Sequence, residues 1–527
     1  MSAAENDVKA LLRAGFEALT RGDIPRASDC CQRALAIRPD VPQAHFLVGL
    51  TALEANQRET AFQAFGSVTR LDPANAAAWA HLARLFMGEG LVVRADAALA
   101  EAKKAGSRDP MVLDLMGSVY SLMGEYGLAA ECFESAVSLR PDHPPFLLNL
   151  ANNLVYFGET DAAVEILEKI VRIQPDSPQA HWSLSGARKA SDDTHITVMA
   201  RLVLAQSNPR ARAFYYYAIG KELEDLGRWD DAFEAFVRGA GERRKTVEYD
   251  ESAESAMFDY LAGTFTESWL ASKGKGHEDE SPIFVLGQPR TGTTLIDRII
   301  SAHSQVHSAG ELQQLGLAIR RLSDYRDPKR FSVGFFEAAR DIPAHRIGQV
   351  YLDTTKRVRG GAPRFIDKLP QNYLMIPIIL AAMPRAKIVH LTRDPVDACF
   401  SSFKQLFADA YLHSYDLGEM ARHHIRYRRL MSTWRERFGE RFLDISYEET
   451  VSDLEPNARR LIDFLGLDWE PACLAFHEQA TAVSTASAVQ VREPAHTRSV
   501  GRWRRYSAQL EPMIRELAAA GLHSPVD

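Results

Sequence analysis

The sequence lacks the features that mark disulfide-rich, zinc-binding or membrane-spanning proteins. Its 527 residues include only five cysteines, without CxxC or His-paired spacing, which indicates neither a disulfide framework nor a zinc site and predicts a reduced, cytoplasmic chain. The longest apolar run, Leu374 to Met383, is about half the length that a bilayer span requires. The N-terminus has no apolar signal region, so we expect a soluble protein that is not exported.

An excess of positive charge is also absent. Lys and Arg number 62 against 69 Asp and Glu, which gives a net charge of −7. Because a general nucleic-acid binder is usually basic, any phosphate binding must be local, and we expect no nucleic-acid partner. With 46% apolar and 25% charged residues, the composition is that of a folded globular protein rather than of a disordered or collagen-like chain.

The N-terminal half repeats with a period of 34 residues. Prolines follow this step, or a multiple of it, at Pro39, Pro73, Pro141, Pro175 and Pro209. Glycines that would end the first helix of a hairpin stand at Gly22, Gly90, Gly124 and Gly158. A period of this length predicts stacked helical hairpins. Small residues repeat in two further series, and we expect the small residue on the first helix of each hairpin to face the small residue on the second.

This pattern resembles the tetratricopeptide repeat over roughly residues 6–240. The resemblance implies a right-handed superhelix whose concave face holds an extended peptide or another protein partner. The sixth unit has Asp192 in place of the turn glycine and Thr197 in place of the alanine, so we expect its second helix to be distorted. Packing against the rest of the chain, or formation of a homo-oligomer, is an open alternative role for the repeats.

The C-terminal half alternates short apolar strands with helical patterns. We expect strands at 282–287, 364–367, 387–392 and 442–445, each followed by a helix, and therefore a parallel sheet covered on both faces. Ligands bind such a sheet at the carboxyl ends of its strands. The predicted fold is multidomain: an all-α tetratricopeptide-repeat superhelix at 1–245, a helical connection and linker at 246–281, and an α/β P-loop-like domain with a parallel sheet at 282–527.

A glycine-rich loop, Gly287-Gln-Pro-Arg-Thr-Gly-Thr-Thr294, follows the first expected strand. Glycine permits a tight turn, amides at a helix start bind an anion, and Thr293 and Thr294 add hydroxyl donors. The two glycines match the outer spacing of the nucleoside-triphosphate P-loop, but Thr293 replaces its lysine, which disfavours an ATPase or a kinase. Arg290 supplies a cation instead. Alone, the loop is also compatible with a turn that opens an ordinary helix.

A second candidate for phosphate binding, Arg393-Asp-Pro-Val-Asp-Ala-Cys-Phe-Ser401, follows the third expected strand. Asp394 and Pro395 suit the cap and first turn of a helix, which puts Ser401 about two turns beyond Arg393. An arginine and a hydroxyl in this arrangement could both face one phosphate. Taken alone, a capped structural helix explains the segment better.

Together the two segments resemble the nucleotide-binding segments of sulfotransferases that use 3′-phosphoadenosine 5′-phosphosulfate (PAPS), especially the protein-tyrosine sulfotransferase and related bacterial branch. The resemblance covers roughly residues 282–506. It implies that the 5′-phosphosulfate is held by Arg290, Thr291, Gly292, Thr293 and Thr294, and the 3′-phosphate by Arg393, Ser401, Ser487 and Arg502. Where this chain has Arg502, the family often has a lysine. Tyr447 resembles the tyrosine that contacts adenine.

The charge distribution at the C-terminal end agrees with an anion site. Five arginines gather within fourteen residues of an otherwise acidic chain: Arg492, Arg498, Arg502, Arg504 and Arg505. A solvated basic face remains an alternative for the last two.

The resemblance further implies transfer of a sulfuryl group from PAPS to an acceptor hydroxyl, a reaction that needs a base and no metal. Glu311 stands at the family's distance from Arg290 for the catalytic base, although only the second of the family's two adjacent glutamates is present, after Gly310. Lys368 resembles the lysine that stabilises the transferred group and the leaving phosphate. His303 and His307 are alternative bases.

We therefore expect a PAPS-dependent sulfotransferase whose repeat domain recruits a protein or peptide with an acceptor tyrosine. A glycan hydroxyl and a lipid-linked sugar fit the same chemistry. The alternatives from other classes are a P-loop phosphotransferase and a repeat scaffold with an inactive C-terminal fold. Joint presence of Arg290, Lys368, Arg393, Ser401 and Glu311 argues against the scaffold.

Overall fold

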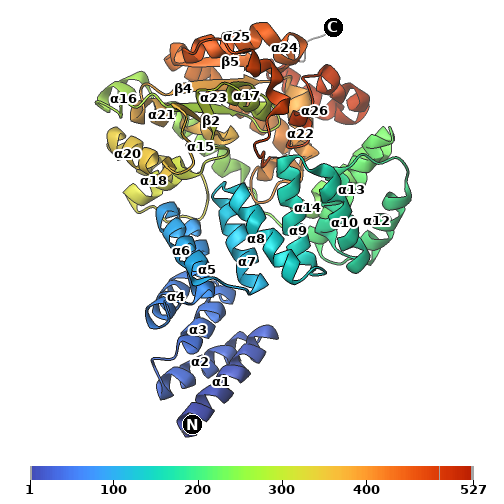
Figure 1. Cartoon of the computed structure of the whole chain (residues 1–527). Helices are drawn as coiled ribbons and strands as arrows, with labels where there is room; N and C mark the ends of the chain where they lie inside the picture. The colour runs from blue at the N-terminus through green and yellow to red at the C-terminus, as the bar shows by residue number, and fades with distance from the viewer. Residues whose placement is uncertain (1–2, 486, 524–527) are drawn as a thin grey trace. The chain divides into compact units, whose positions relative to one another are not determined.

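The chain divides into two compact units, Met1–Leu150 and Ala151–Asp527. The computed structural model describes residues 3–485 and 487–523 (Figure 1). The division falls inside the helical array, because the last hairpins of the array pack against the sheet-containing part of the chain.

The first unit is built from helical hairpins with tight turns. Its helices are α1 (Ala3–Thr20), α2 (Ile24–Ile37), α3 (Pro42–Glu54), α4 (Arg58–Leu71), α5 (Ala76–Gly88), α6 (Val92–Ala105), α7 (Pro110–Leu122) and α8 (Tyr126–Leu139). Gly22, Gly90 and Gly124 lie in these turns with φ angles of 74°, 69° and 83°, which confirms the predicted turn positions. In the second hairpin Asn56 takes this position with φ 55°.

The small residues of the first helices accommodate aromatic rings. A Cβ on Gly49 would lie 2.7 Å from the ring of Phe65, and one on Gly117 would lie 2.6 Å from the ring of Phe133. Both phenylalanines come from the second helix of the same hairpin. The expectation that small residues face each other is therefore wrong at these positions, where glycine gives space to a large side chain and so fills the hairpin core.

The second unit continues the array. Its helices here are α9 (Pro144–Phe157, which begins in the first unit), α10 (Thr160–Ile173), α11 (Pro178–Ala187), α12 (Thr194–Ala205), α13 (Pro209–Asp225) and α14 (Trp229–Arg244). The sixth pair departs from a regular hairpin, since α11 and α12 both pack against α13. A buried polar group joins them: Glu222 of α13 accepts a hydrogen bond from Ser185 at 2.8 Å and lies 2.6 Å from His195 Nδ1.

A five-stranded, all-parallel sheet forms the centre of the second unit. Its strands are β1 (Pro282–Gly287), β2 (Val306–Ser308), β3 (Arg364–Lys368), β4 (Lys387–Thr392) and β5 (Phe442–Ser446), in the order β2-β3-β1-β4-β5. The chain leaves β1 toward one edge and β4 toward the other, so the topological switch point lies between these two strands. The parallel sheet confirms the prediction, and β2 is an additional strand.

Helices cover both faces of this sheet. Alternate residues of β1 separate the two cores: Ile283 and Val285 pack with α17 and α25, whereas Phe284 and Leu286 pack with helices that include α15, α20 and α23. The helices are α15 (Glu251–Thr264), α16 (Glu267–Ser272), α17 (Thr293–Ser301), α18 (Gln314–Ser323), α19 (Val333–Asp341), α20 (Ala344–Thr355), α21 (Ile376–Ala382), α22 (Pro395–Phe403), α23 (Leu417–Phe438), α24 (Tyr447–Ser452), α25 (Leu454–Leu465) and α26 (Ser507–Ala519).

Short 3₁₀ turns complete the fold. They are η1 (Pro370–Met375), η2 (Leu412–Tyr415), η3 (Gly439–Arg441), η4 (Pro471–Glu478), η5 (Gln490–Arg492), η6 (Thr497–Ser499) and η7 (Arg502–Tyr506). Residues 273–281, the expected linker, form no helix or strand, and His277 N donates to Ala382 O at 2.7 Å. Within the described ranges, no helix is long and apolar enough to cross a bilayer.

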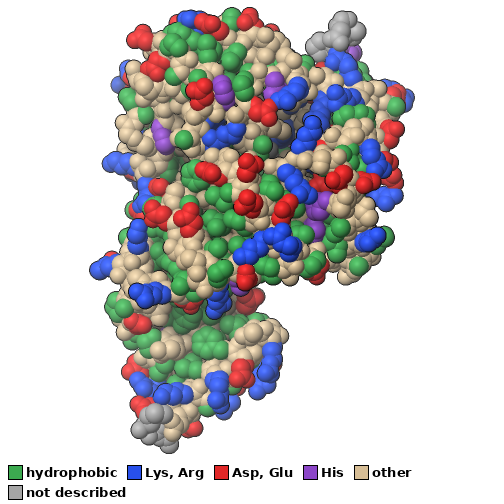
Figure 2. Space-filling view, turned by 45° about the vertical axis from the view of Figure 1, so that its right-hand side comes forward, with side chains coloured by type: hydrophobic (Ala, Val, Ile, Leu, Met, Phe, Trp, Pro, Cys, Tyr) green, Lys and Arg blue, Asp and Glu red, His purple; other side chains and the backbone are tan. Residues whose placement is uncertain are grey.

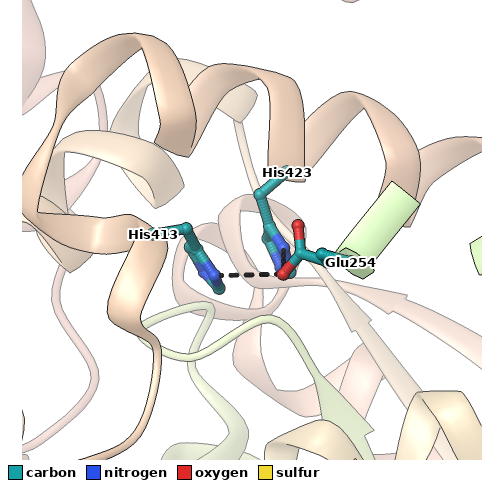
Figure 3. A group of neighbouring side chains, drawn as sticks. All are labelled: Glu254, His413 and His423. Atoms are coloured by element: carbon teal, nitrogen blue, oxygen red, sulfur yellow. Dashed lines mark hydrogen bonds and ion pairs between the residues drawn. The ribbon is translucent and has the colours of Figure 1, made fainter. Parts of the chain in front are cut away.

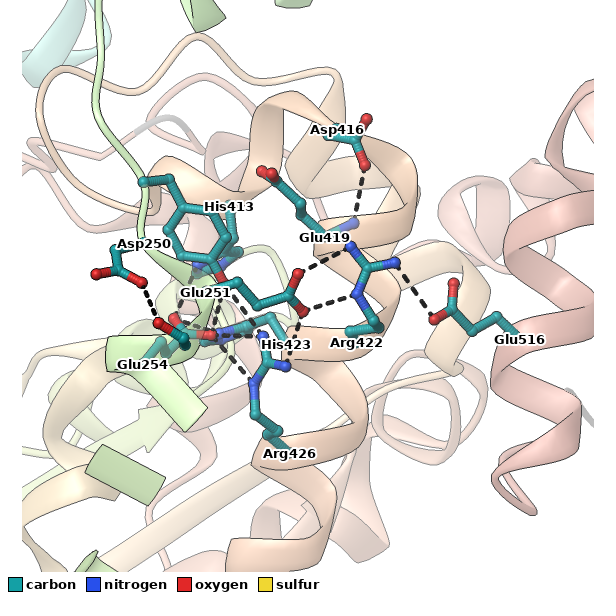
Figure 4. Close-up of polar contacts among 12 residues, drawn as sticks. Asp250, Glu251, Glu254, His413, Asp416, Glu419, Arg422, His423, Arg426 and Glu516 are labelled. Carbon is teal, nitrogen blue, oxygen red and sulfur yellow. Dashed lines mark hydrogen bonds and ion pairs between the residues drawn. The ribbon is translucent and has the colours of Figure 1, made fainter. Parts of the chain in front are cut away.

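An ionic network joins α15 to α23. Arg422 and Arg426 of α23 donate to Glu251 of α15 at 2.7 and 2.9 Å (Figure 4). Arg426 also donates to Glu254 at 2.8 Å. These contacts fix the segment before the first strand to the helix behind the sheet.

Candidate functional site

The loop between β1 and α17 forms the first part of the site. Gly292 precedes α17 with φ 99°, and a Cβ there would lie 2.5 Å from Cδ2 of Tyr447, so both the backbone conformation and the packing require glycine. Thr291, Thr293 and Thr294 are buried. Among the residues that the structure describes, no side chain caps the start of α17. Its first amides are therefore directed to an anion or to solvent.

The two predicted phosphate-binding segments meet at the switch point between β1 and β4. Arg393, directly after β4, donates through Nη1 to the carbonyl of Arg290 at 2.8 Å. Its guanidinium lies 4.6 Å from the centre of the Tyr447 ring. Burial and the neighbouring Arg393 lower the pKa of Arg290 to about 10. Two desolvated guanidinium groups this close favour a bound anion between them.

The C-terminal segment covers this loop. Arg290 Nη1 donates to Ser487 Oγ at 2.6 Å, and the hydroxyl oxygens of Thr294 and Thr485 lie 3.2 Å apart. The same segment is held from the helical array, since Val483 N donates to the carbonyl of Tyr156 in α9 at 2.8 Å. Arg290 and Ser487, 197 residues apart in the chain, are therefore neighbours in the fold.

Arg502 is positioned by the turn in which it lies. Asp397 of α22 accepts hydrogen bonds from Gly501 N at 2.6 Å and from Trp503 N at 3.1 Å. Arg502 itself donates to Glu224 of α13 at 3.2 Å. Helix α22, which begins just after Arg393, thus fixes the backbone on both sides of Arg502.

Ser401 lies on α22 and is half-buried. Its neighbour Ser402 is fully buried and donates to the carbonyl of Pro289 in the first loop at 3.2 Å. The helix is therefore fastened to the loop through Ser402, and a phosphate contact of Ser401 remains a prediction.

Glu311 and Lys368 form an ion pair beside the phosphate loop. Lys368 ends β3 with its side chain 1% exposed, and its Nζ donates to Glu311 Oε1 at 2.6 Å. The Glu311 side chain is 39% exposed, so it reaches solvent where Lys368 does not. Asp297 of α17 is buried nearby, and burial raises the pKa of its carboxyl while Lys368 opposes the shift.

The two alternative histidine bases have other surroundings. His303 is buried, and its Nε2 lies 2.8 Å from the carbonyl oxygen of Asp468, which indicates a structural role. His307 is half-buried against Gly360, and burial lowers its pKa. Glu311, by contrast, is partly exposed and paired with Lys368, and its role as the base remains a prediction.

Sequence reasoning missed several polar residues near Glu311. Arg330 and Tyr411 both interact electrostatically with Glu311, and burial lowers the pKa of Arg330. Burial raises the pKa of Asp367, the residue before Lys368, to about 7. Arg330 and Tyr411 come from irregular segments without a motif, so only their position in the fold identifies them.

One cluster has the composition of a metal site. The ligand atoms of Glu254, His413 and His423 lie within 4.8 Å of one another (Figure 3). The two imidazole rings stack with centroids 3.5 Å apart, and Glu254 already accepts a hydrogen bond from Arg426 at 2.8 Å. A guanidinium on the carboxylate disfavours a divalent cation, so we interpret the cluster as part of the ionic network that joins α15 and α23.

Positive charge on the molecular surface is local. Lys and Arg side chains gather at the upper right of the face drawn in Figure 2, whereas both charges are mixed over the rest of that face. This distribution agrees with the expectation that an acidic chain would bind an anion only locally.

Two family models match separate segments of the chain. Residues 282–471 match the model of the sulfotransferase family, and residues 1–181 match that of the cilia and flagella-associated protein 70 C-terminal domain. An uncharacterized protein of Aquifex aeolicus (strain VF5) is 32% identical over 62% of this chain and 44% of its own length. A protein-tyrosine sulfotransferase of Drosophila melanogaster is 23% identical over 46% and 53%, respectively, so the match spans about half of each relative.

Two solved structures are each similar to part of the chain. The sulfotransferase domain from the curacin biosynthetic pathway has 17% identity and a TM-score of 0.36, covering 48% of this chain and 100% of that chain. YrrB, a TPR protein with an unusual peptide-binding site, has 15% identity and a TM-score of 0.28, covering 39% and 96%. Residues 282–471 are thus similar to the sulfotransferase family, protein-tyrosine sulfotransferases included, and they follow a helical array that is similar to tetratricopeptide-type repeats.

Proposed function

We propose that this protein transfers a sulfuryl group from PAPS to an acceptor hydroxyl. The observation that carries the proposal is the meeting of the loop around Arg290 with Arg393 at the β1/β4 switch point, beside the Glu311–Lys368 pair. Similarity to the sulfotransferase family supports the reaction type. The missing P-loop lysine and the arginines at the loop disfavour transfer from ATP.

Unpartnered donors fit a nucleotide with two phosphate groups. Among the described residues, the buried Nε atoms of Arg393 and Arg502 have no hydrogen-bond partner. An unpaired buried donor is costly, and a phosphate oxygen would satisfy it. We assign the 3′-phosphate to Arg393, Arg502, Ser401 and Ser487, with the ring of Tyr447 against adenine.

The second phosphate, which carries the sulfuryl group in PAPS, is assigned to the start of α17. The amides and hydroxyls of Thr293 and Thr294 are suited to this role, together with Thr291, Gly292 and the guanidinium of Arg290. When bound, PAPS supplies an activated sulfuryl group on its 5′-phosphate.

In the proposed reaction, a Glu311 carboxylate oxygen accepts the proton of the acceptor hydroxyl. The acceptor oxygen bonds to sulfur while the bond between sulfur and the 5′-phosphate oxygen breaks, which leaves adenosine 3′,5′-bisphosphate. Lys368 is paired with Glu311 in the present geometry. Movement of its Nζ to the transferred group or the leaving oxygen frees the carboxylate and places positive charge where negative charge develops.

We further propose that the acceptor is a tyrosine on a protein or peptide recruited by the repeats. Similarity to protein-tyrosine sulfotransferases and the tetratricopeptide-type repeats support this choice. Tyr411 and Arg330 near Glu311 are suited to line the acceptor side. Glycan and lipid-linked hydroxyls are the alternative acceptors to compare with tyrosine peptides in the transfer assay.

The test combines nucleotide binding with turnover. The full-length protein should bind adenosine 3′,5′-bisphosphate, and it should transfer label from ³⁵S-PAPS to tyrosine peptides. Glu311→Gln should keep the binding but lose at least a hundredfold in turnover, since general-base contributions are on the order of 10²–10⁴. Glu455→Gln, an exposed residue paired with Arg459 on α25, is the control.

Three results would redirect the assignment. Retained turnover in Glu311→Gln places the base elsewhere, and Mg²⁺-dependent ATP hydrolysis supports a phosphotransferase. Absence of any nucleotide binding supports an inactive scaffold.

A further inference from the structure

A largely buried lysine at the end of α22 has no role in the proposed reaction. Lys404 follows α22 directly and is three residues beyond Ser401, which puts both side chains on one helix face. Its side chain is 13% exposed, and its Nζ lies 4.8 Å from the ring centre of Phe400. A cation in such an apolar setting needs a counter-charge.

The counter-charge comes from the helical array. Glu224 of α13 is 9% exposed and accepts from Lys404 Nζ at 2.7 Å and from the Tyr506 hydroxyl at 2.5 Å. Its second oxygen accepts from Arg502 at 3.2 Å. One carboxylate of the last hairpin therefore binds two cations, one of which is assigned to the 3′-phosphate.

Lys404 interacts electrostatically with Arg290 of the phosphate loop as well as with Glu224 and Arg502. Burial lowers the pKa of Lys404; Glu224 opposes this shift, whereas Arg502 and Arg290 reinforce it. In the described part of the chain, Asp397 is a second carboxylate beside these cations, 3.8 Å from Arg393. Glu224 and Asp397 thus partly neutralise Lys404, Arg502 and Arg393, and Arg290 adds a further positive charge nearby, a setting that favours an anion.

We propose that Lys404 is a further nucleotide-binding residue and that Glu224 is its built-in counter-charge. Glu224 neutralises Lys404 and Arg502 in the empty site, and nucleotide phosphate takes over part of their charge on binding. The last hairpin of the array is then a component of the nucleotide site, in addition to any role in recruiting partners. This inference rests on the proposed function.

The decisive variant is Glu224→Gln in the full-length protein. In the free protein this variant leaves Lys404 and Arg502 without their carboxylate partner, so the two cations repel each other. A bound phosphate would reduce this repulsion. We expect a lower melting temperature without ligand, together with a several-fold lower Kd for adenosine 3′,5′-bisphosphate in calorimetric titration. Lys404→Gln should instead raise that Kd at least fivefold.

Glu222→Gln is the matched control. Glu222 lies two residues away on the same helix, is also buried, and contacts His195 and Ser185 of the array. It should lower stability while leaving the nucleotide Kd unchanged.

The outcomes separate this inference from the proposed function. Equal or weaker binding in Glu224→Gln overturns the counter-charge role, and unchanged binding in Lys404→Gln overturns the lysine assignment even if the first variant does not fold. If the wild-type protein binds no adenosine 3′,5′-bisphosphate, the proposed function fails and this inference fails with it.

Discussion

Replacement of Arg393 by alanine offers a strong test of the nucleotide site. Arg393 is 8% exposed, lies against Tyr447, and uses its two Nη atoms to hold the carbonyls of Arg290 and Ser499 at 2.8 and 2.6 Å. Only its Nε lacks a partner among the described residues. A phosphate bound there would be a desolvated charge pair, whose loss typically costs about 2–5 kcal/mol.

This energy corresponds to a Kd for adenosine 3′,5′-bisphosphate that rises roughly 30-fold to several thousand-fold. Because Arg393 is assigned to the 3′-phosphate, adenosine 5′-phosphate should lose much less affinity. Calorimetric titration of both nucleotides therefore separates loss of one contact from general damage to the loop. Arg459→Ala, at an exposed arginine of α25, serves as the control.

Equal losses for the two nucleotides would refute the assignment of Arg393 to the 3′-phosphate. Arg393→Lys should recover only part of the affinity, because an ammonium group keeps the charge but not the planar fork of donors.

Two further predictions concern stability around the sheet. Gly292→Ala should lower the free energy of unfolding by about 1–3 kcal/mol and abolish nucleotide binding, because its Cβ would contact Tyr447 and its φ is 99°; unchanged denaturant unfolding would contradict this. Burial raises the pKa of Asp367 to about 7, above its usual value near 4, so this carboxyl should cost stability progressively as pH rises from about 4 to about 7. The melting temperature of Asp367→Asn relative to that of the wild type should therefore rise as the pH increases from about 4 to about 7. Melting temperatures that change in parallel with pH in the two proteins would contradict the raised pKa of Asp367.

The array was predictable because its period repeats local signals. Turn glycines such as Gly22 and Gly124 have the positive φ angles that their spacing predicts. The contact between Gly49 and Phe65 was not predictable, because the spacing of small residues does not specify which side chain packs against them. Strand β2 was also missed, because its three residues are too short for a periodic pattern.

The meeting of the two candidate phosphate-binding segments was predictable, because each is one continuous motif at the end of a strand. The loop around Arg290 and the segment after β4 are continuous motifs, and the parallel sheet brings their ends together. The bond between Lys404 and Glu224 joins residues 180 positions apart, with no shared motif. Such a contact depends on how the last hairpin packs on α22, which sequence spacing does not determine.

The most direct measurement is a crystal structure of the full-length protein with adenosine 3′,5′-bisphosphate. We expect the 3′-phosphate within hydrogen-bond distance of Arg393 and the 5′-phosphate against the amides of Thr293 and Thr294. A nucleotide bound away from the β1/β4 switch point, or one in which these two phosphate positions are empty, would contradict this expectation.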